Sequence, residues 1–371
     1  MPIVASKVDE LLSRARQDVE SGLLPSCQVA LASGGELVAF ETFGDADNDT
    51  RYCLFSATKA FVAGVMWQLL AEGLVDEQAK VADLVPEFGT NGKDVVTVEQ
   101  VMLHTSGFPM APLPHPVWST RPGRLERFSA WRLNWEPGTR YQYHPTSAHW
   151  VLAEIIDRVT GGDYRSEVDR RIVQPLALRF ELGVPVDRQG GIAELRLVGE
   201  PATPDELAAK LGVRELPLTE VTDDALMGFN NPEIRAVGVP GGGGFGRAAD
   251  LALYSQELLH DTQGLWDPDV LADVTGNVRN RLPDPVFGVP ANRSLGLILA
   301  GSDGRAAERG LGRTVSPGAF GHNGAGGQLA WGDPVTGLSL GYVTNGLDRH
   351  TIRQGRRDVA IASRAGVCTE A

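Results

Sequence analysis

A serine and a lysine three residues apart, Ser56 and Lys59, are the residues whose types and spacing most directly suggest chemistry. They stand at the predicted start of a helix, where residues three apart lie on one face. A serine hydroxyl is a weak nucleophile until a base takes its proton, and an amine in an apolar setting is able to do so. The motif alone also fits a surface serine beside a solvated lysine. However, the eight apolar residues at 60–67 make a fully solvated lysine hard to place.

Two further segments contain residues suited to a site. Residues 136–145 form a turn that places Tyr141 and Tyr143 just before a predicted helix, and this pair also fits simple packing at the helix entry. Residues 318–327 are rich in glycine and include His322. Glycines leave backbone N–H groups open, which suits a tight strand entry or close approach to a ligand.

The elements that must position these residues are predicted at both ends of the chain. Apolar, β-rich runs indicate strands, and 3.6-residue periodicity with glycine stops indicates helices. The expected strands are 28–32, 36–43, 295–300, 328–331 and 338–344. The expected helices include the one that ends at Glu72 with Gly73 as its cap, and 147–159, 250–259 and 350–364. Because strands gather at both ends, one sheet shared by the two ends is expected.

The order of these elements predicts an α+β fold with an antiparallel sheet flanked by helices. Residues 1–75 and 236–371 are expected to form the sheet domain, with 76–235 as an inserted, mostly helical domain. We expect a ligand cleft between the two parts.

The composition limits the kinds of partner that the protein is expected to bind. The 371 residues carry a formal charge of −13, and the basic residues are spread out, which argues against a nucleic-acid or anionic-membrane surface. No apolar stretch is long enough to span a bilayer, and residues 1–20 read as an amphipathic helix rather than a signal peptide. The chain has three cysteines, Cys27, Cys53 and Cys368. An odd number without metal-binding spacing fits a reduced, cytoplasmic protein.

No metal or cofactor is predicted. The histidines lack metal-binding spacing. The glycine run at 241–246 matches G-x-G-x-x-G, but no βαβ start precedes it and no acidic residue follows at the right distance. We interpret it as a turn before a helix, and the Leu103–Gly107 segment around Ser106 as the end of another helix. The expected partner is a small ester or amide, and the sequence leaves the oligomeric state open.

Taken in order, these segments resemble the serine β-lactamase/penicillin-binding-protein superfamily, and most closely the class C β-lactamases and family VIII carboxylesterases. The resemblance covers about residues 20–350. The Ser56–Lys59 tetrapeptide matches the S-x-x-K motif. Tyr143-His144-Pro145 stands where these families carry Tyr-x-Asn, and His322-Asn323-Gly324 where they carry Lys-Thr-Gly or His-x-Gly. Residues 103–107 and 240–246 match two further signatures.

The resemblance implies roles for these residues. Ser56 attacks an acyl carbonyl and becomes an acyl-enzyme, while Lys59 and Tyr143 share the proton transfers in a division left open here. The backbone N–H groups of Ser56 and Ala325 form the oxyanion hole. His322 supports this group or binds the acyl side of the substrate. Asn323 and Gly324 are assigned to substrate binding.

Two departures from the family pattern favour esters. Pro145 replaces an asparagine that contacts the amide of β-lactam side chains, and His322 replaces the lysine that offers a fixed charge to a substrate carboxylate. We therefore predict a cytoplasmic serine hydrolase of small carboxylic esters. The alternatives are a β-lactam or amide hydrolase, an acyltransferase on the same scaffold, or a non-catalytic acyl sensor that does not turn over.

Overall fold

The computed structural model describes residues 1–216 and 220–370, which are built around an antiparallel sheet. Within the described residues this sheet has six strands in the order β2-β1-β10-β9-β8-β7. The strands are β1 Ser26–Ser33, β2 Glu36–Gly44, β3 Tyr52–Cys53, β4 Glu181–Leu182, β5 Arg196–Val198, β6 Gly244–Gly246, β7 Ile298–Leu299, β8 Phe320–Gly321, β9 Leu329–Asp333, β10 Leu338–Thr344 and β11 Gly346–Asp348.

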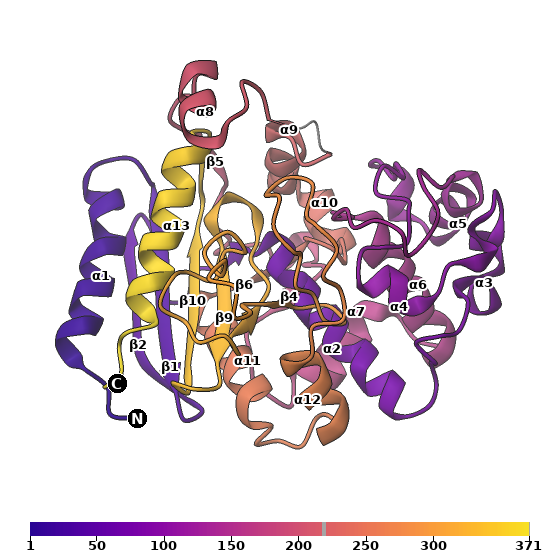
Figure 1. The fold of residues 1–371 in the computed structure, drawn as a ribbon, viewed down its shortest axis with the longest axis horizontal. Helices are drawn as coiled ribbons and strands as arrows, with labels where there is room; N and C mark the ends of the chain where they lie inside the picture. The colour runs from indigo at the N-terminus through magenta and orange to yellow at the C-terminus, as the bar shows by residue number, and fades with distance from the viewer. Residues whose placement is uncertain (217–219, 371) are drawn as a thin grey trace.

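Helices cover both faces of this sheet and extend to one side of it (Figure 1). The α-helices are α1 Ala5–Glu20, α2 Thr58–Ala71, α3 Val81–Leu84, α4 Val98–Met102, α5 Arg121–Ala130, α6 Ser147–Thr160, α7 Tyr164–Val168, α8 Pro204–Leu211, α9 Asp223–Met227, α10 Pro232–Val237, α11 Ala248–His260, α12 Pro268–Gly276 and α13 Thr351–Ala365.

The two ends of the chain share the sheet, as the sequence predicts. β1 pairs antiparallel with β10, and Cys27 lies opposite Thr344. At the chain ends, the Val4 N–H donates to the Cys368 carbonyl, so α1 and α13 lie side by side on one face (Figure 1). The α+β fold with a central antiparallel sheet is thereby confirmed.

The pleat of β1 divides the core into two layers. Val29 and Leu31 pack with α1 and α13, whereas Ala30 and Ala32 point to the opposite face. This alternation follows from the two-residue period of a strand. The second face is covered by α11, and the small alanines there let the backbone of this helix come close to the sheet.

Helix α2 is apolar on all sides because protein surrounds it. Nearly all of its residues are buried, including Lys59, which is fully buried. The helix ends at Ala71 with Glu72 as its C-cap, within one residue of the expected end, and Gly73 follows with a φ of 68°.

The strand predicted at 295–300 is shorter than expected. Only Ile298–Leu299 pairs as β7, because Gly296 turns the chain with a φ of 105° and donates to the Ser294 carbonyl. Short strands β4 and β5 lie within the middle segment and pair with β6 and β11. The division into a sheet domain and an inserted helical domain, 76–235, stays a prediction.

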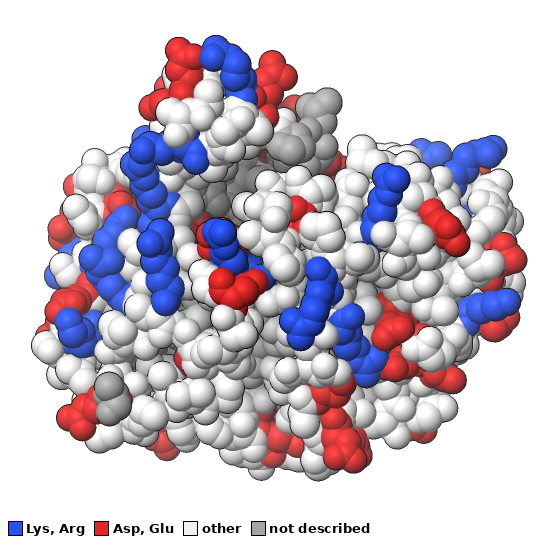
Figure 2. Space-filling model, viewed as in Figure 1, with Lys and Arg blue, Asp and Glu red and all other residues white. Residues whose placement is uncertain are grey.

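The surface carries both signs of charge. Figure 2 shows lysine, arginine and acidic side chains interspersed over one face. Within the described residues no helix is both long and apolar enough to cross a membrane. The three cysteines are buried and unpaired, and the cytoplasmic location inferred from them stays a prediction.

The close packing of α11 on the sheet is tested by a substitution at a glycine on β10. A Cβ on Gly341 would lie 1.9 Å from the Ala248 carbonyl oxygen. We expect Gly341→Ala to lower the free energy of unfolding by about 2 kcal/mol or more, because the helix must move. Gly355→Ala is the matched control, since Gly355 is exposed on α13 with open space around it. It should raise stability by about 0.5–1 kcal/mol. Urea unfolding of both variants measures the difference, and equal effects would contradict this packing.

Candidate active site

Ser56 lies at the entrance to α2. It belongs to a short 3-10 turn, Phe55–Ala57, that leads directly into the helix, and it is partly exposed while both of its neighbours are buried. Phe55 adopts a φ of 44°, unusual for a bulky residue, so the chain turns sharply just before the serine. This turn holds the Ser56 hydroxyl at the protein surface, at the start of the buried helix α2.

The amine of Lys59 is held by three oxygens. Its Nζ lies 3.1 Å from Ser56 Oγ, 2.7 Å from the Pro145 carbonyl oxygen and 2.5 Å from the Gly241 carbonyl oxygen. A Cβ on Gly241 would come within 2.8 Å of the Pro145 oxygen and 3.3 Å of Nζ. The glycine run is therefore a structural turn that brings a carbonyl to the lysine, and no nucleotide site is implied.

Burial makes the neutral form of this amine favourable. The pKa of Lys59 is held well below its usual value by burial and, secondarily, by the positive charge of Arg293. Carbonyl oxygens only accept hydrogen bonds, so a neutral amine gives its two N–H bonds to Pro145 and Gly241. The nitrogen lone pair is left for the Ser56 proton.

Tyr143 stands over the lysine. The Lys59 Nζ lies 5.0 Å from the centre of its ring. Its hydroxyl is buried and has no hydrogen-bond partner of good geometry among the described residues. Burial raises the pKa of Tyr143 to about 12, although Arg293 and the nearby Ser56 hydroxyl oppose the shift. At neutral pH the side chain is therefore a phenol, which is a proton donor.

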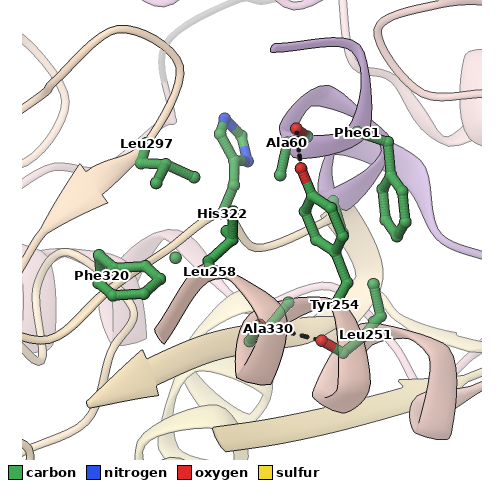
Figure 3. Close-up of a pocket in the computed structure, with 12 residues that line it drawn as sticks. Ala60, Phe61, Leu251, Tyr254, Leu258, Leu297, Phe320, His322 and Ala330 are labelled. Atoms are coloured by element: carbon green, nitrogen blue, oxygen red, sulfur yellow. Dashed lines mark hydrogen bonds between the residues drawn. The ribbon is translucent and has the colours of Figure 1, made fainter. Parts of the chain in front are cut away.

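His322 is a neutral imidazole in this site. Its Nδ1 donates to the Asn323 carbonyl oxygen at 3.0 Å, which leaves Nε2 as an acceptor facing Arg293 Nη1 at 3.4 Å. Burial and then Arg293 hold the pKa of His322 well below its usual value. In Figure 3 the ring extends away from the apolar side chains of Leu258 and Phe320, which line a small pocket at its base.

Arg293 is a site residue that the sequence analysis missed. It is 7% exposed, and its Nε donates to the Tyr141 hydroxyl at 2.8 Å. Its guanidinium carbon lies 5.1 Å from the ring centre of Tyr143. No acidic side chain of the described residues pairs with it. A single arginine between the apolar stretches 289–291 and 295–300 is the signal that could have found it.

This arginine corrects one expectation. The replacement of lysine by His322 was expected to leave no fixed positive charge in the site, and that is wrong because Arg293 stands beside the imidazole. A guanidinium keeps its charge at any working pH. The site therefore combines a neutral histidine with a permanent cation.

The glycine-rich loop lies against the serine turn. A Cβ on Gly324 would lie 2.2 Å from the Leu54 carbonyl oxygen, so Ala325 comes next to the chain that leads into Ser56. The Asn323 amide donates to the Gly310 carbonyl and accepts from the Ala330 N–H. Because both ends of this amide are used within the protein, it holds the loop. Its assigned contact with substrate stays a prediction that this geometry does not favour.

The second serine with a nearby histidine is internal. Ser106 is fully buried and its hydroxyl lies 3.2 Å from His144 Nε2, which also accepts from the Phe108 N–H. The segment follows α4, and His104 accepts from the His144 N–H. The turn interpretation is confirmed, and this serine has no access to a substrate.

Comparisons of the sequence and of the structure with known proteins agree with this geometry. The sequence matches the beta-lactamase family over residues 11–364. It is 30% identical to the esterase/beta-lactamase LipL of Mycobacterium tuberculosis over 330 residues, or 81% of this chain and 70% of LipL. A penicillin-binding-protein homologue from Caulobacter crescentus superposes with a TM-score of 0.79 at 26% identity, covering 98% of both chains. A family VIII carboxylesterase superposes with a TM-score of 0.77 at 26% identity, covering 98% of this chain and 99% of that one. The chain therefore belongs to the beta-lactamase family of serine hydrolases.

The buried histidines predict a stability that falls in mild acid. Burial lowers the pKa of four histidines below 6.5, in the case of His144 to about 3. These are His104, His144, His149 and His322. Between pH 6.5 and about 3 the unfolded chain therefore binds more protons than the folded one. The free energy of unfolding should fall by up to about 1.4 kcal/mol per pH unit for each histidine.

Urea unfolding between about pH 7 and about pH 5 measures this slope. His144→Asn should make it shallower, whatever the change in stability at neutral pH. Replacing the exposed His260 by asparagine should leave the slope unchanged. If His144→Asn keeps the wild-type slope, the imidazole is not held neutral in the folded protein.

Proposed function

We propose that the protein hydrolyses small carboxylic esters through an acyl-enzyme on Ser56. The observation that carries this proposal is the hydrogen bonding of Lys59, whose N–H groups are held by two carbonyl oxygens while its third position faces Ser56 Oγ. A base oriented in this way meets the geometric requirement for activating a serine.

The proposed reaction consists of the acylation of Ser56 followed by its deacylation. Lys59 takes the Ser56 proton as Oγ bonds to the carbonyl carbon, and the oxyanion is stabilised by the N–H groups of Ser56 and Ala325. When the ester C–O bond breaks, the leaving alkoxide receives a proton from the Tyr143 phenol, which Lys59 then reprotonates. Water next attacks the acyl-enzyme with Lys59 as base, and Ser56 recovers its proton. The high pKa of Tyr143 favours this division over a phenolate base.

The relatives support ester chemistry. The name of LipL gives both esterase and beta-lactamase, and a relative from Burkholderia gladioli, 25% identical over 298 residues, is named esterase EstB. Pro145 adds to this support, because its side chain has no group to bind an amide. An ester substrate needs no such contact.

Turnover of a simple ester tests the proposal. We expect steady hydrolysis of p-nitrophenyl butyrate by the wild type, and loss of activity by about 10³-fold or more in Ser56→Ala with an unchanged melting temperature. Nitrocefin, assayed in parallel, identifies the alternatives. Turnover of nitrocefin alone would indicate a lactam hydrolase, and a stoichiometric burst without turnover would indicate an acyl sensor. Butyryl transfer to an added alcohol in preference to water would indicate an acyltransferase. Full ester activity in Ser56→Ala would overturn the assignment.

β-Lactam hydrolysis is the second candidate because of Arg293. A substrate carboxylate that enters the site meets a permanent cation beside His322, at a place where the sequence alone suggested none. Such a cation offsets part of the cost of removing a carboxylate from water.

Charge selectivity tests the role of Arg293. We expect Arg293→Gln to lower kcat/KM for the mono-p-nitrophenyl ester of succinic acid about tenfold more than for p-nitrophenyl butyrate. The two acyl groups have similar length and differ in charge, so the butyrate ester serves as the matched control. Equal losses for both esters would mean that Arg293 acts only by holding His322 and Tyr141.

A further inference from the structure

Glu220 is an acidic residue next to the site that the mechanism above does not use. Its Oε1 accepts hydrogen bonds from the Thr146 N–H at 3.1 Å and from the Thr146 hydroxyl at 3.0 Å. Thr146 precedes the first turn of α6, and its own side chain makes no capping hydrogen bond to the helix. A glutamate from a distant part of the chain therefore supplies the acceptor at this helix end.

A single peptide group joins this glutamate to the catalytic lysine. The Pro145 carbonyl oxygen accepts from Lys59 Nζ, and the N–H of the same peptide, on Thr146, donates to Glu220. This peptide is trans, so its oxygen and its N–H point in opposite directions. A carboxylate on the N–H side polarises the group and makes the oxygen a stronger acceptor for the lysine.

We propose that Glu220 is a positioning residue that sets the proton affinity of the Ser56–Lys59–Tyr143 group through the Pro145–Thr146 peptide. The inference rests on the proposed function, because it gives that group its role in activating Ser56. The carboxylate touches neither the substrate nor the serine, so its effect is electrostatic and passes through the peptide and the space beside it.

The charges around Lys59 support a specific effect of Glu220. Arg293 lowers the pKa of Lys59, and Glu220 raises it. Glu220 also raises the pKa of Tyr143. The remaining titratable groups that face the lysine are neutral imidazoles. They are His149 on α6, His104 on the loop after α4 and His322 on the loop after β8. Glu220 thus acts in the same direction on both side chains that transfer protons in the proposed mechanism.

The pKa of Glu220 is itself subject to opposing effects. Burial raises the pKa of Glu220, while its hydrogen bonds to Thr146, and the positive charge of Lys59 when that amine is protonated, oppose the shift. The sign of the effect on catalysis follows directly. Removing the negative charge makes Lys59 and Tyr143 lose their protons more readily, so the basic form persists to lower pH whichever of the two is the base.

The experiment compares Glu220→Gln with the wild type. Glutamine keeps an oxygen that accepts from the Thr146 N–H but carries no charge. The readout is the pH dependence of the second-order rate at which a fluorophosphonate labels Ser56, followed by mass spectrometry. We expect the acid limb of this profile to move to lower pH by about one unit, the size expected for a unit charge at an effective dielectric of about 20.

Thr146→Val is the control for the helix end. It removes one hydrogen bond to Glu220 but keeps the charge and the backbone N–H, so the acid limb should stay at the wild-type pH. If Glu220→Gln does not fold, the pair Glu220→Asp and Glu220→Asn replaces it. These two side chains have equal length, and only the aspartate should keep the limb near its wild-type position.

The outcomes separate this proposal from the proposed function. An acid limb of Glu220→Gln that coincides with the wild type would overturn the proposal and reduce Glu220 to a helix cap. A wild-type protein whose Ser56 is not labelled at any pH would instead overturn the proposed function. A change in melting temperature moves neither conclusion, because the limb is a ratio of rates within one variant.

Discussion

The cost of burying the Lys59 amine governs the whole site. A charge in that position would lose its water and, among the described residues, would contact two backbone carbonyl oxygens and the Ser56 hydroxyl but no carboxylate. Burial shifts the balance towards the neutral amine, and the carbonyl oxygens fix its N–H bonds, which is also what a base for Ser56 requires. Stability and chemistry therefore favour the same protonation state. The glycine at 241 follows from this constraint, because any side chain there would separate the carbonyl from the amine.

The sequence predicts the main strands and helices because they carry strong local signals. The hairpin of β1 and β2, the apolar helix α2 and the glycine after it all have patterns that a few residues define. Strands gathering at both ends of the chain predict a shared sheet, but they do not predict that β1 pairs with β10. The shortening of β7 could not be foreseen, because it depends on a turn at Gly296 that packs against Ala63 on α2. Contacts of this kind arise from tertiary packing.

The site shows the same limit. Ser56, Lys59, Tyr143 and His322 stand in motifs, and the structure brings all four together. Arg293 and Glu220 stand in no motif, and their importance comes from the distances to residues far away in the chain. Asn323 illustrates the opposite case, since its place in a motif predicts substrate contact while its amide binds the protein on both sides. Motifs identify groups by type, whereas electrostatics depends on every charge within several ångströms.

Lysine and arginine divide two tasks in this site. The arginine keeps its charge when buried, and part of the cost is offset by the Tyr141 hydroxyl and by the faces of two tyrosine rings. The lysine is able to lose its proton, and the nearby arginine promotes that loss. Exchanging the two residue types would leave the serine without a base, because a guanidinium does not deprotonate. The neutral His322 lies beside the arginine, and its Nε2 accepts from the cation without adding a second charge. One fixed cation and one neutral amine are thus the arrangement in which this site holds both a positive field and a base.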